Sequence, residues 1–512
     1  MAGPSILLAT LNARYSHASM GLRYLLANLG DLSDQAALRE FTINDPLPVV
    51  AERLLAGSPR IIAFGVYIWN LRETTRVVRI IKAVDPRVRI VIGGPEVSHE
   101  YEHEPLVALA DVLITGEADL VFPGVCRDLL AGQAVPHVVV SPKPDLATLA
   151  LPYDHYTDED LAHRVIYVEA SRGCPYTCEF CLSSIENGVR AFPLDHFLTA
   201  MDRLIQRGCR TFKFVDRTFN LNPRTATAIL EFFLARLRPS LFLHFEMVPD
   251  RLPDAVKALI ARFPAGAIQF EIGIQSFTPA VGELISRRMD RAKTVENLEW
   301  LRRNTGVHVH ADLIIGLPGE TMATLAESFD ALWWLQPGEI QVGILKLLKG
   351  TPLARHRDAF AMVYNPDPPY DLLQSLAFDF PTMQRLKRFA RYFELYANSG
   401  RFRAGLDLLI ARAGSSPFAA LLAFSDWLWD TLAQEHGISL KRLYELIAVF
   451  LITRLGCSDA EVSTTLAEDF LSAHGNPQGV LKGLPEFLRA EVEVRQRSQR
   501  SSPPSLAAPA AR

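Results

Sequence analysis

The sequence predicts an α/β protein in three parts: a doubly wound parallel sheet, a run of six β/α units, and an all-helical C-terminal domain. Mostly apolar strand patterns alternate with helical patterns in residues 1–140 and again in residues 161–355. Such alternation is typical of parallel sheets that are covered by helices. In residues 360–495 only helical periodicity remains.

Composition and charge limit the classes of partner. The chain has 512 residues, of which 49% are apolar, and a formal net charge of −4. A mildly acidic chain gives no electrostatic reason to bind nucleic acid or an anionic membrane. No apolar run reaches the roughly 18 residues that a membrane span needs. The first residues, MAGPSILLATLNARYSH, have no basic segment before their short apolar run. We therefore expect a cytoplasmic protein with neither membrane nor nucleic acid as a partner.

The first part of the chain contains five strand patterns with helical patterns between them. The strand patterns are residues 5–11, 38–44, 60–68, 89–94 and 111–116, and the helical patterns are residues 21–30, 74–84 and 120–132. Five strands in this length indicate an open doubly wound domain, which binds ligands at the carboxyl ends of its strands.

The second part begins after residues 141–160, which carry prolines and acidic residues without a clear period and are interpreted as a linker. Six units are more than half of a (β/α)8 barrel, in which chemistry takes place at the C-terminal ends of the strands. The strand patterns are residues 165–171, 211–216, 241–247, 268–276, 307–316 and 340–346, with clear helical patterns at 195–208 and 222–237.

The third part is expected to be helical throughout. Its most apolar stretch, residues 419–433, is interrupted by two aspartates and predicts a buried helix. Residues 496–512 are rich in Pro, Ala and Ser, a composition that predicts a disordered tail.

Three of the six cysteines lie within eight positions, in CPYTCEFC (174–181), directly after the first strand of the second part. In a reducing compartment this spacing favours metal ligation over a disulfide. A structural zinc site needs four ligands, and no second CxxC supplies the fourth, although a zinc-stabilised binding protein stays an alternative. An iron–sulfur cluster is usually held by four thiolates. Three thiolates leave one coordination position open, which is a feature of catalytic metal sites.

The segment from Ser171 to Cys181 resembles the signature of radical S-adenosylmethionine (SAM) enzymes. The resemblance implies that Cys174, Cys178 and Cys181 hold a 4Fe–4S cluster and that SAM chelates the fourth iron. It also implies that one electron from the cluster cleaves SAM to methionine and a 5′-deoxyadenosyl radical. Phe180 matches the family's aromatic position, which packs near the adenine. The family core is a partial (β/α)6 barrel, in agreement with the six predicted units.

Three residues at other strand ends resemble positions that contact SAM in this family. Asp216 ends the second strand and resembles the position that, in relatives, helps to hold the SAM amino group. Glu271 and Gln275 lie on the fourth strand, near the expected place of the ribose. The alternative is that these polar groups only satisfy loop backbone at the barrel mouth.

The fifth and sixth strands add further candidates with the same alternative. The segment HADLIIGLPGET (310–321) resembles the family's fifth-strand segment. In it, Asp312 is expected to point inward, and Gly316 and Gly319 would allow close backbone approach. Lys346 ends the sixth strand.

The first domain resembles the flavodoxin-like, cobalamin-binding domain of cobalamin-dependent radical SAM enzymes, so that the resemblance covers about residues 1–355. Relatives carry a Gly-Gly pair after the fourth strand, where the cofactor tail approaches the backbone. Tight turns of any doubly wound fold would explain the same glycines. The residues expected to contact cobalamin are Tyr67, Trp69, Asn70, Gly93, Gly94, Gly116 and Glu117.

A histidine ligand to cobalt is not clearly encoded. Many cobalamin domains carry Asp-x-His-x-x-Gly after the first strand. Here Tyr15 replaces the aspartate, and three residues instead of two separate His17 from Gly21. A free or helix-capping His17 is favoured, and ligation of cobalt stays open.

Two other features bear on function. Methylthiotransferases of the superfamily have three further cysteines in their N-terminal domain, whereas this chain has only Cys126 there.

The helical C-terminal part resembles, more loosely, a domain of uncharacterised function found in one subgroup of cobalamin radical SAM proteins. We expect that domain to wall off the barrel mouth and to shape the substrate pocket.

The resemblance implies an oxygen-sensitive enzyme whose cofactors are a 4Fe–4S cluster, SAM and cobalamin, with a one-electron donor such as flavodoxin or ferredoxin. The expected reaction is methyl transfer to an unactivated carbon or phosphorus atom. The alternatives are a non-methylating cyclisation, rearrangement or oxidation, and a radical SAM enzyme whose α/β domain has lost its cofactor. No motif identifies the substrate.

Overall fold

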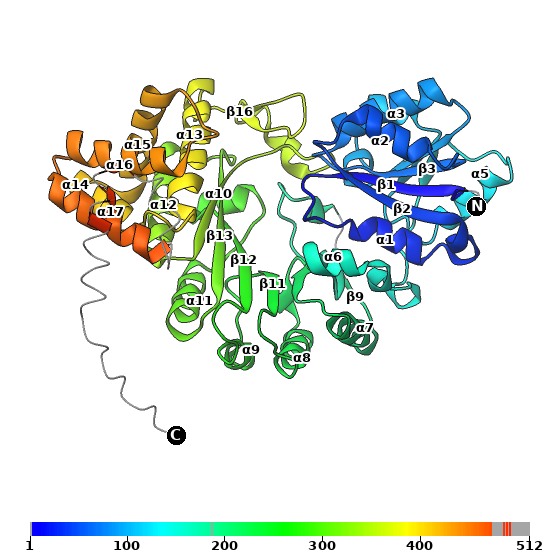
Figure 1. Cartoon of the computed structure of the whole chain (residues 1–512), viewed down its shortest axis with the longest axis horizontal. Coiled ribbons are helices and arrows are strands. Elements are labelled where there is room, and N and C mark those ends of the chain that lie inside the picture. The colour runs from blue at the N-terminus through cyan, green and yellow to red at the C-terminus, as the bar shows by residue number, and fades with distance from the viewer. Residues whose placement is uncertain (1–2, 186–187, 474–484, 487, 490, 493–512) are drawn as a thin grey trace.

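The computed structural model of the chain describes residues 3–185, 188–473, 485–486, 488–489 and 491–492. Three bodies lie in a row: the N-terminal α/β domain, the open barrel, and the helical domain (Figure 1). The predicted fold class is confirmed. The tail predicted at 496–512 lies outside the described residues.

The N-terminal domain is a six-stranded parallel sheet in the order β2-β1-β3-β4-β5-β6. The strand order reverses between β1 and β3, which is where open sheets of this kind bind ligands. The sixth strand was not predicted, because three residues at an exposed edge leave no period to detect. The elements are β1 (Ile6–Asn12), α1 (Met20–Ala27), β2 (Ala36–Thr42), α2 (Leu47–Leu55), β3 (Ile61–Gly65), α3 (Leu71–Val84), β4 (Arg89–Gly93), α4 (Pro105–Leu109), β5 (Val112–Thr115), α5 (Phe122–Leu130) and β6 (Val138–Val140).

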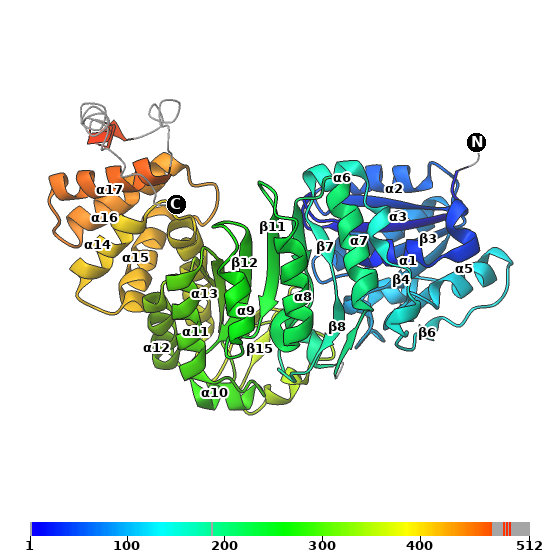
Figure 2. The same ribbon diagram turned by 90° about the horizontal axis from the view of Figure 1, so that it is seen from below.

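The barrel sheet contains six parallel strands that neighbour one another in chain order. Burial alternates strictly along its central strands, so that apolar side chains face the outer helices and polar ones face the interior. Figure 2 shows the helices packed along the outside of this sheet. The elements are α6 (Asp158–His163) before the sheet, β7 (Ile166–Val168), α7 (Leu194–Gln206), β10 (Thr211–Phe214), α8 (Pro223–Leu234), β11 (Phe242–Met247), α9 (Asp254–Ile260), β12 (Ile268–Gln275), α10 (Pro279–Leu284), α11 (Arg291–Asn304), β13 (His308–Ile315), α12 (Met322–Leu335) and β14 (Glu339–Ile344).

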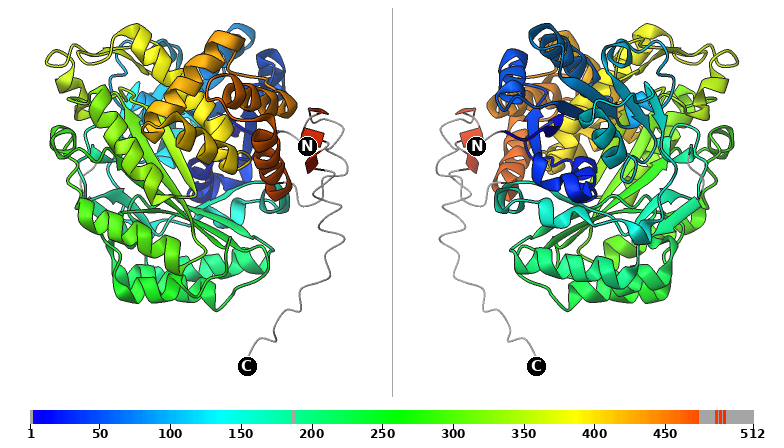
Figure 3. Two further views of the ribbon diagram at one scale, coloured as in Figure 1. Left: turned by 90° about the vertical axis from the view of Figure 1, so that its left-hand side faces the viewer. Right: turned by 90° about the vertical axis from the view of Figure 1, so that its right-hand side faces the viewer.

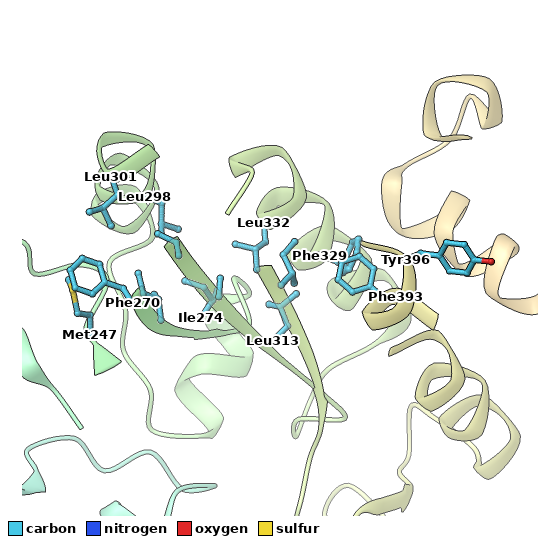
Figure 4. Packing of buried hydrophobic residues seen from close by; sticks show 14 of the residues in the cluster. Met247, Phe270, Ile274, Leu298, Leu301, Leu313, Phe329, Leu332, Phe393 and Tyr396 are labelled. Atoms are coloured by element: carbon cyan, nitrogen blue, oxygen red, sulfur yellow. The ribbon is translucent and has the colours of Figure 1, made fainter. Parts of the chain in front are cut away.

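The helical domain packs against the outer barrel helix α12. The ring of Phe329 lies 5.5 Å from Phe389, 5.3 Å from Phe393 and 5.6 Å from Phe418. Figure 4 shows the apolar core continuing from β12 and β13 through α12 into α13. Seen end on, the two terminal domains lie on the side opposite the row of barrel helices (Figure 3). The helices are α13 (Phe380–Phe393), a π-helical turn (Glu394–Asn398), α14 (Arg403–Ala413), α15 (Pro417–Leu432), α16 (Leu440–Thr453) and α17 (Asp459–Ala473).

The segment before α13 is not helical, in contrast to the prediction of helix from residue 360. It forms a small antiparallel hairpin of β15 (Val363–Tyr364) and β16 (Leu372–Gln374). Three prolines within residues 366–369 exclude a helix here. The segment also hydrogen-bonds beyond β14: Leu372 N–H donates to the Leu345 carbonyl at 2.8 Å, and Leu347 N–H to the Tyr370 carbonyl at 3.1 Å.

The free edge of β14 is paired by a side chain of the helical domain. Asn398 accepts a hydrogen bond from the backbone N–H of Ile340 at 3.1 Å and donates one to the carbonyl of the same residue at 2.9 Å. An edge strand otherwise exposes unpaired backbone groups that invite aggregation. The helical domain therefore pairs part of the last edge of the barrel sheet.

Among the described residues, no single helix is long and apolar enough to cross a membrane. Helices α14 and α15 would pass that criterion only as a pair, and a bend of 104° separates them.

We predict that Asn398→Ala lowers the free energy of unfolding by about 1–2 kcal/mol, because it leaves a strand N–H and C=O without partners. Urea denaturation followed by circular dichroism measures this change. Asn304→Ala is the matched control, since Asn304 donates to only one carbonyl, within its own exposed helix end. Equal effects of the two substitutions would contradict the edge-pairing role.

Candidate functional site

The cysteine segment is a loop closed by a short hairpin that the sequence did not predict. Strand β8 (Ser171–Cys174) pairs with β9 (Gly188–Ala191), and Cys174 stands opposite Gly188. Gly173 has a φ of 93°, and a Cβ there would collide with the Gly188 carbonyl oxygen. Only glycine allows this close pairing of the loop ends.

The three cysteines line one cavity of about 250 Å³ at the barrel mouth, here called the cysteine cavity. Burial raises the pKa of the Cys174 thiol. Among the described residues, no group of three Cys, His, Asp or Glu side chains is close enough to hold a single metal ion. The other lining residues include Phe180, Arg217, Glu246, Glu271, Gly273, Gln275, Arg287 and Asp312.

Two charged residues that sequence reasoning missed fix the cysteine loop. Arg287 donates to the Cys178 sulfur at 3.4 Å and to the carbonyl of Gly273. Glu179, which is 3% exposed, accepts from the Ser286 hydroxyl at 2.6 Å, pairs with His356 at 2.9 Å, and also pairs with Arg355. For Glu179 the sequence did offer a signal, because an acidic residue lies there between two closely spaced cysteines.

Three of the residues predicted on barrel strands face the cysteine cavity. Gln275 has a φ of 67° at a register shift of β12, and its Oε1 is buried without a hydrogen-bond partner among the described residues. Oδ1 of Asp312 is likewise buried without a hydrogen bond among them, although Nε2 of His310 lies 3.4 Å away. Glu271 is paired with His244 at 2.9 Å and Lys213 at 3.5 Å, and the hydrogen bond from His244 lowers its pKa to about 2. Buried oxygens that lack hydrogen bonds, beside three cysteines, fit a polar ligand that forms hydrogen bonds.

The other three residues predicted on strands do not line this cavity. Asp216 accepts from the Ala170 N–H at 3.0 Å and the Ser171 hydroxyl at 2.5 Å, so it fixes the backbone ahead of the cysteines. Gly316 is covered by Leu372. Lys346 lies beside Asp371 with their charged atoms 4.0 Å apart. Each is engaged by tertiary contacts that a strand pattern does not reveal.

A second cavity, of about 390 Å³, lies at the carboxyl edge of the N-terminal sheet and is here called the sheet-edge cavity. It is lined by residues of α1, by the ends of β3, β4 and β5, and by Glu169 and Arg172 before the cysteine loop. Of the residues predicted to contact cobalamin, it includes Tyr67, Gly93, Gly94, Gly116 and Glu117.

The lining of the sheet-edge cavity includes two glycines with a positive φ and a buried tyrosine. Gly94 has a φ of 117°, and a Cβ there would collide with the Val66 carbonyl. Gly116 has a φ of 77°. Tyr24, which sequence reasoning missed, is 1% exposed, and its hydroxyl makes no hydrogen bond of good geometry among the described residues.

Two predicted residues, Trp69 and Asn70, are not among those lining the sheet-edge cavity. Asn70 is fully buried; its amide donates to Thr10, Leu11 and Gly65 and accepts from the Tyr67 N–H, so it holds the turn after β3. Trp69 is 44% exposed and stacks on Tyr67 with ring centroids 4.5 Å apart.

His17 reaches the barrel instead of capping a helix. Its Nδ1 lies 2.5 Å from the hydroxyl of Tyr167 on β7, and Ser19 is the residue that caps α1. His17 is not among the residues lining the sheet-edge cavity. The structure thus gives this side chain a role at the domain interface.

Comparison with known proteins identifies three regions. Residues 6–125 match the B12 binding domain, residues 168–332 match the radical SAM superfamily, and residues 358–502 match a protein family of unknown function, DUF4080. The first two matches confirm the predicted family and its cofactors: SAM, a 4Fe–4S cluster and cobalamin.

The curated relatives are distant. The cobalamin-dependent radical SAM methyltransferase TokK of Streptomyces tokunonensis is 26% identical over 370 residues, covering 62% of this chain and 52% of that protein. The anaerobic magnesium-protoporphyrin IX monomethyl ester cyclase of Cereibacter sphaeroides is 23% identical over 325 residues, covering 56% and 51%. The chain thus spans about half the length of these relatives.

Among solved structures, the cobalamin-dependent SAM radical enzyme OxsB with aqua-cobalamin bound has a similar fold. The TM-score is 0.62 at 13% identity, and the match covers 97% of this chain and 84% of that one. The likeness therefore extends over all three parts of the fold.

We predict that Asp312→Asn stabilises the protein at alkaline pH. Burial, with Glu271 and Glu246 nearby, raises the pKa of Asp312 from 3.8 to about 8. The folded protein thus holds a proton that the unfolded chain releases, so that this group's stabilisation is lost as pH rises from about 4 to about 8. Asparagine does not titrate. In urea titrations, the variant should gain at least about 1 kcal/mol relative to wild type between pH 5 and pH 8.5. A difference that does not change with pH would contradict the assignment.

Proposed function

We propose that this chain, which belongs to the cobalamin-dependent radical SAM family, transfers a methyl group to an unactivated carbon or phosphorus atom of its substrate. The observation that supports this most is the position of residues 169–174. Glu169 and Arg172 line the sheet-edge cavity, and Cys174 lines the cysteine cavity. Two residues of chain span at most about 7 Å, so ligands in the two cavities would lie close together.

In the cysteine cavity, Cys174, Cys178 and Cys181 would hold the cluster and leave one iron for SAM. When bound, the cluster and SAM supply a radical that takes a substrate hydrogen atom, and cobalamin supplies the methyl group. The protein's carboxyl groups differ in what they offer a ligand. Asp312, with a pKa of about 8, holds a proton at neutral pH and can donate a hydrogen bond. Glu271, with a pKa of about 2, is ionised and only accepts.

In the sheet-edge cavity, Gly93, Gly94 and Gly116 would let the cobalamin tail lie against the backbone, and Tyr67 would contact it. Trp69, which is stacked on Tyr67 outside the cavity, would contact cobalamin only where the cofactor extends beyond the cavity. A one-electron donor such as flavodoxin or ferredoxin would supply the reducing electron. The helical domain contributes none of the described residues that line the cysteine cavity, so we propose that it supports the barrel instead of shaping the pocket.

A second candidate is a non-methylating radical cyclisation, rearrangement or oxidation. The similarity to the Cereibacter sphaeroides cyclase supports it, because that relative shares about as much of its length with this chain as TokK does. S-adenosylhomocysteine distinguishes the two, since it is produced by methylation and not by the alternative.

We predict about four irons and about one cobalt per chain when the protein is made anaerobically with cobalamin supplied. After reduction with SAM, chromatography should detect both S-adenosylhomocysteine and 5′-deoxyadenosine. 5′-Deoxyadenosine alone would support the second candidate. Four irons without cobalt would contradict the use of cobalamin, and zinc without iron would contradict both candidates.

We also predict that Gly21→Leu weakens hydroxocobalamin binding at least about tenfold, which is a loss of about 1.4 kcal/mol. Gly21 is exposed on α1 and lines the sheet-edge cavity, and a Cβ there already comes within 3.4 Å of the Tyr67 hydroxyl. Leucine favours helix, so the fold should be retained. Gly124→Leu is the matched control, because Gly124 lies in α5 and a Cβ there would meet nothing within 4 Å among the described residues. Equal affinity of the two variants, with unchanged iron content, would contradict the cobalamin assignment of this cavity.

A further inference from the structure

Arg172 is bound from both domains at once. Its guanidinium donates to Glu169 at 2.9 Å, to Glu117 at 2.7 Å and to Asp119 at 3.0 Å. Glu169 belongs to the barrel segment, whereas Glu117 and Asp119 follow β5 of the α/β domain. All three carboxylates and Arg172 line the sheet-edge cavity.

Aromatic rings complete the enclosure of Arg172. The guanidinium carbon lies 4.6 Å from the ring centre of Tyr24 on α1 and 5.7 Å from that of Phe192, just after β9. The side chain of Arg172 is 15% exposed, and its carboxylate partners are between 6% and 14% exposed. In surroundings with so little water, the interaction energy of an ion pair changes strongly when a ligand displaces water or a neighbouring charge.

The charges in this network are not balanced. Three carboxylates share Arg172, and Arg190, which also pairs with Glu117, is the second cation. Arg190 stands opposite Arg172 in the β8–β9 ladder. Both cations therefore belong to the hairpin that closes the cysteine loop, while two of the three anions belong to the loop after β5.

The connection from Arg172 to the cysteines is short and stiff. Only Gly173 separates Arg172 from Cys174. The backbone of Gly173 packs closely against the carbonyl of Gly188, which leaves it little room to move. Asp216 holds the N–H of Ala170 and the hydroxyl of Ser171 on the other side. A shift of the Arg172 guanidinium can therefore reach Cys174 without being absorbed by a flexible segment.

We propose that Arg172 is a positioning residue that couples the two cavities, so that filling either one strengthens ligand binding in the other. A ligand in the sheet-edge cavity restricts the motion of the loop that contains Glu117 and Asp119. Because Arg172 is bound to that loop, the restriction also fixes the position of Cys174. A cluster on the cysteines fixes Arg172 and, through it, the wall of the sheet-edge cavity. Such coupling is necessarily reciprocal. The proposal rests on the proposed function, in that the two ligands are cobalamin and the iron–sulfur cluster.

Equilibrium dialysis of the full chain against hydroxocobalamin tests the coupling without any turnover. The dissociation constant is measured for the cluster-free protein and for the same preparation after reconstitution with iron and sulfide. We expect the reconstituted wild type to bind at least about fivefold more tightly, the lower end of typical coupling between sites. For Arg172→Lys we expect the two constants to agree within about twofold, because an ammonium lacks the planar fork that bridges the carboxylates.

Two further variants separate this role from general loosening of the structure. Glu169→Gln keeps the arginine and removes only its barrel-side anchor, so it should also reduce the coupling and serves if Arg172→Lys does not fold. Lys349→Gln breaks a different ion pair between the barrel side and the α/β domain, with Glu96 and Glu104, and should leave the coupling intact.

Each remaining outcome overturns the proposal. Equal dissociation constants for the two forms of the wild type exclude coupling, and coupling retained in Arg172→Lys excludes this residue as its carrier. Loss of coupling in Lys349→Gln as well would assign the effect to the whole domain interface. If neither form of the wild type binds hydroxocobalamin, the proposed function fails together with the coupling.

Discussion

The buried ion pairs of Arg172 join the two parallel sheets between their two cavities. A parallel sheet presents its ligand-binding turns at the carboxyl ends of its strands, and this chain has two such sheets in succession. Arg172 joins the turn after β5 of one sheet to the segment after β7 of the other. Removing one partner from such a buried network leaves uncompensated charge and is costly. Arg172 is therefore one of the side chains that hold the two cavities next to each other, together with Lys349, which pairs with Glu96 and Glu104.

The sequence allowed prediction of the features that depend on local pattern. Strand and helix periods located both sheets, and the spacing of Cys174, Cys178 and Cys181 located the loop that lines the cysteine cavity. It could not predict which polar residues at strand ends face a cavity. Asn70 and Asp216 occupy suitable positions, yet their hydrogen bonds go to backbone that comes near only after folding. Glu179 and Arg287 were missed for the same reason, because Ser286 lies 107 positions from Glu179 and Cys178 lies 109 positions from Arg287 in the sequence.

The contacts of the helical domain indicate a different role from the one that its place in the chain suggested. A domain that follows a barrel was expected to cover the mouth. The six-stranded barrel sheet does not close, however, so β14 has a free edge that must be paired. Asn398 pairs part of this edge, the segment at Tyr370 extends its end, and Phe329 anchors the helices beside it. Completion of the sheet is thus the constraint that these contacts satisfy.

Hydrogen-bond satisfaction separates the predicted residues into two groups. Asn70 and Asp216 have their side-chain oxygens and donors engaged, and neither lines a cavity. Gln275 and Asp312 each keep one buried oxygen without a hydrogen bond among the described residues, and Gln275 also has a positive φ. An unsatisfied buried polar group costs about 1–3 kcal/mol, and strained backbone costs about as much. Both costs fall on the side of the barrel that faces the three cysteines. A bound ligand that forms hydrogen bonds with these groups would recover the first cost, so the same residues that lower the stability of the fold are those expected to hold its ligand.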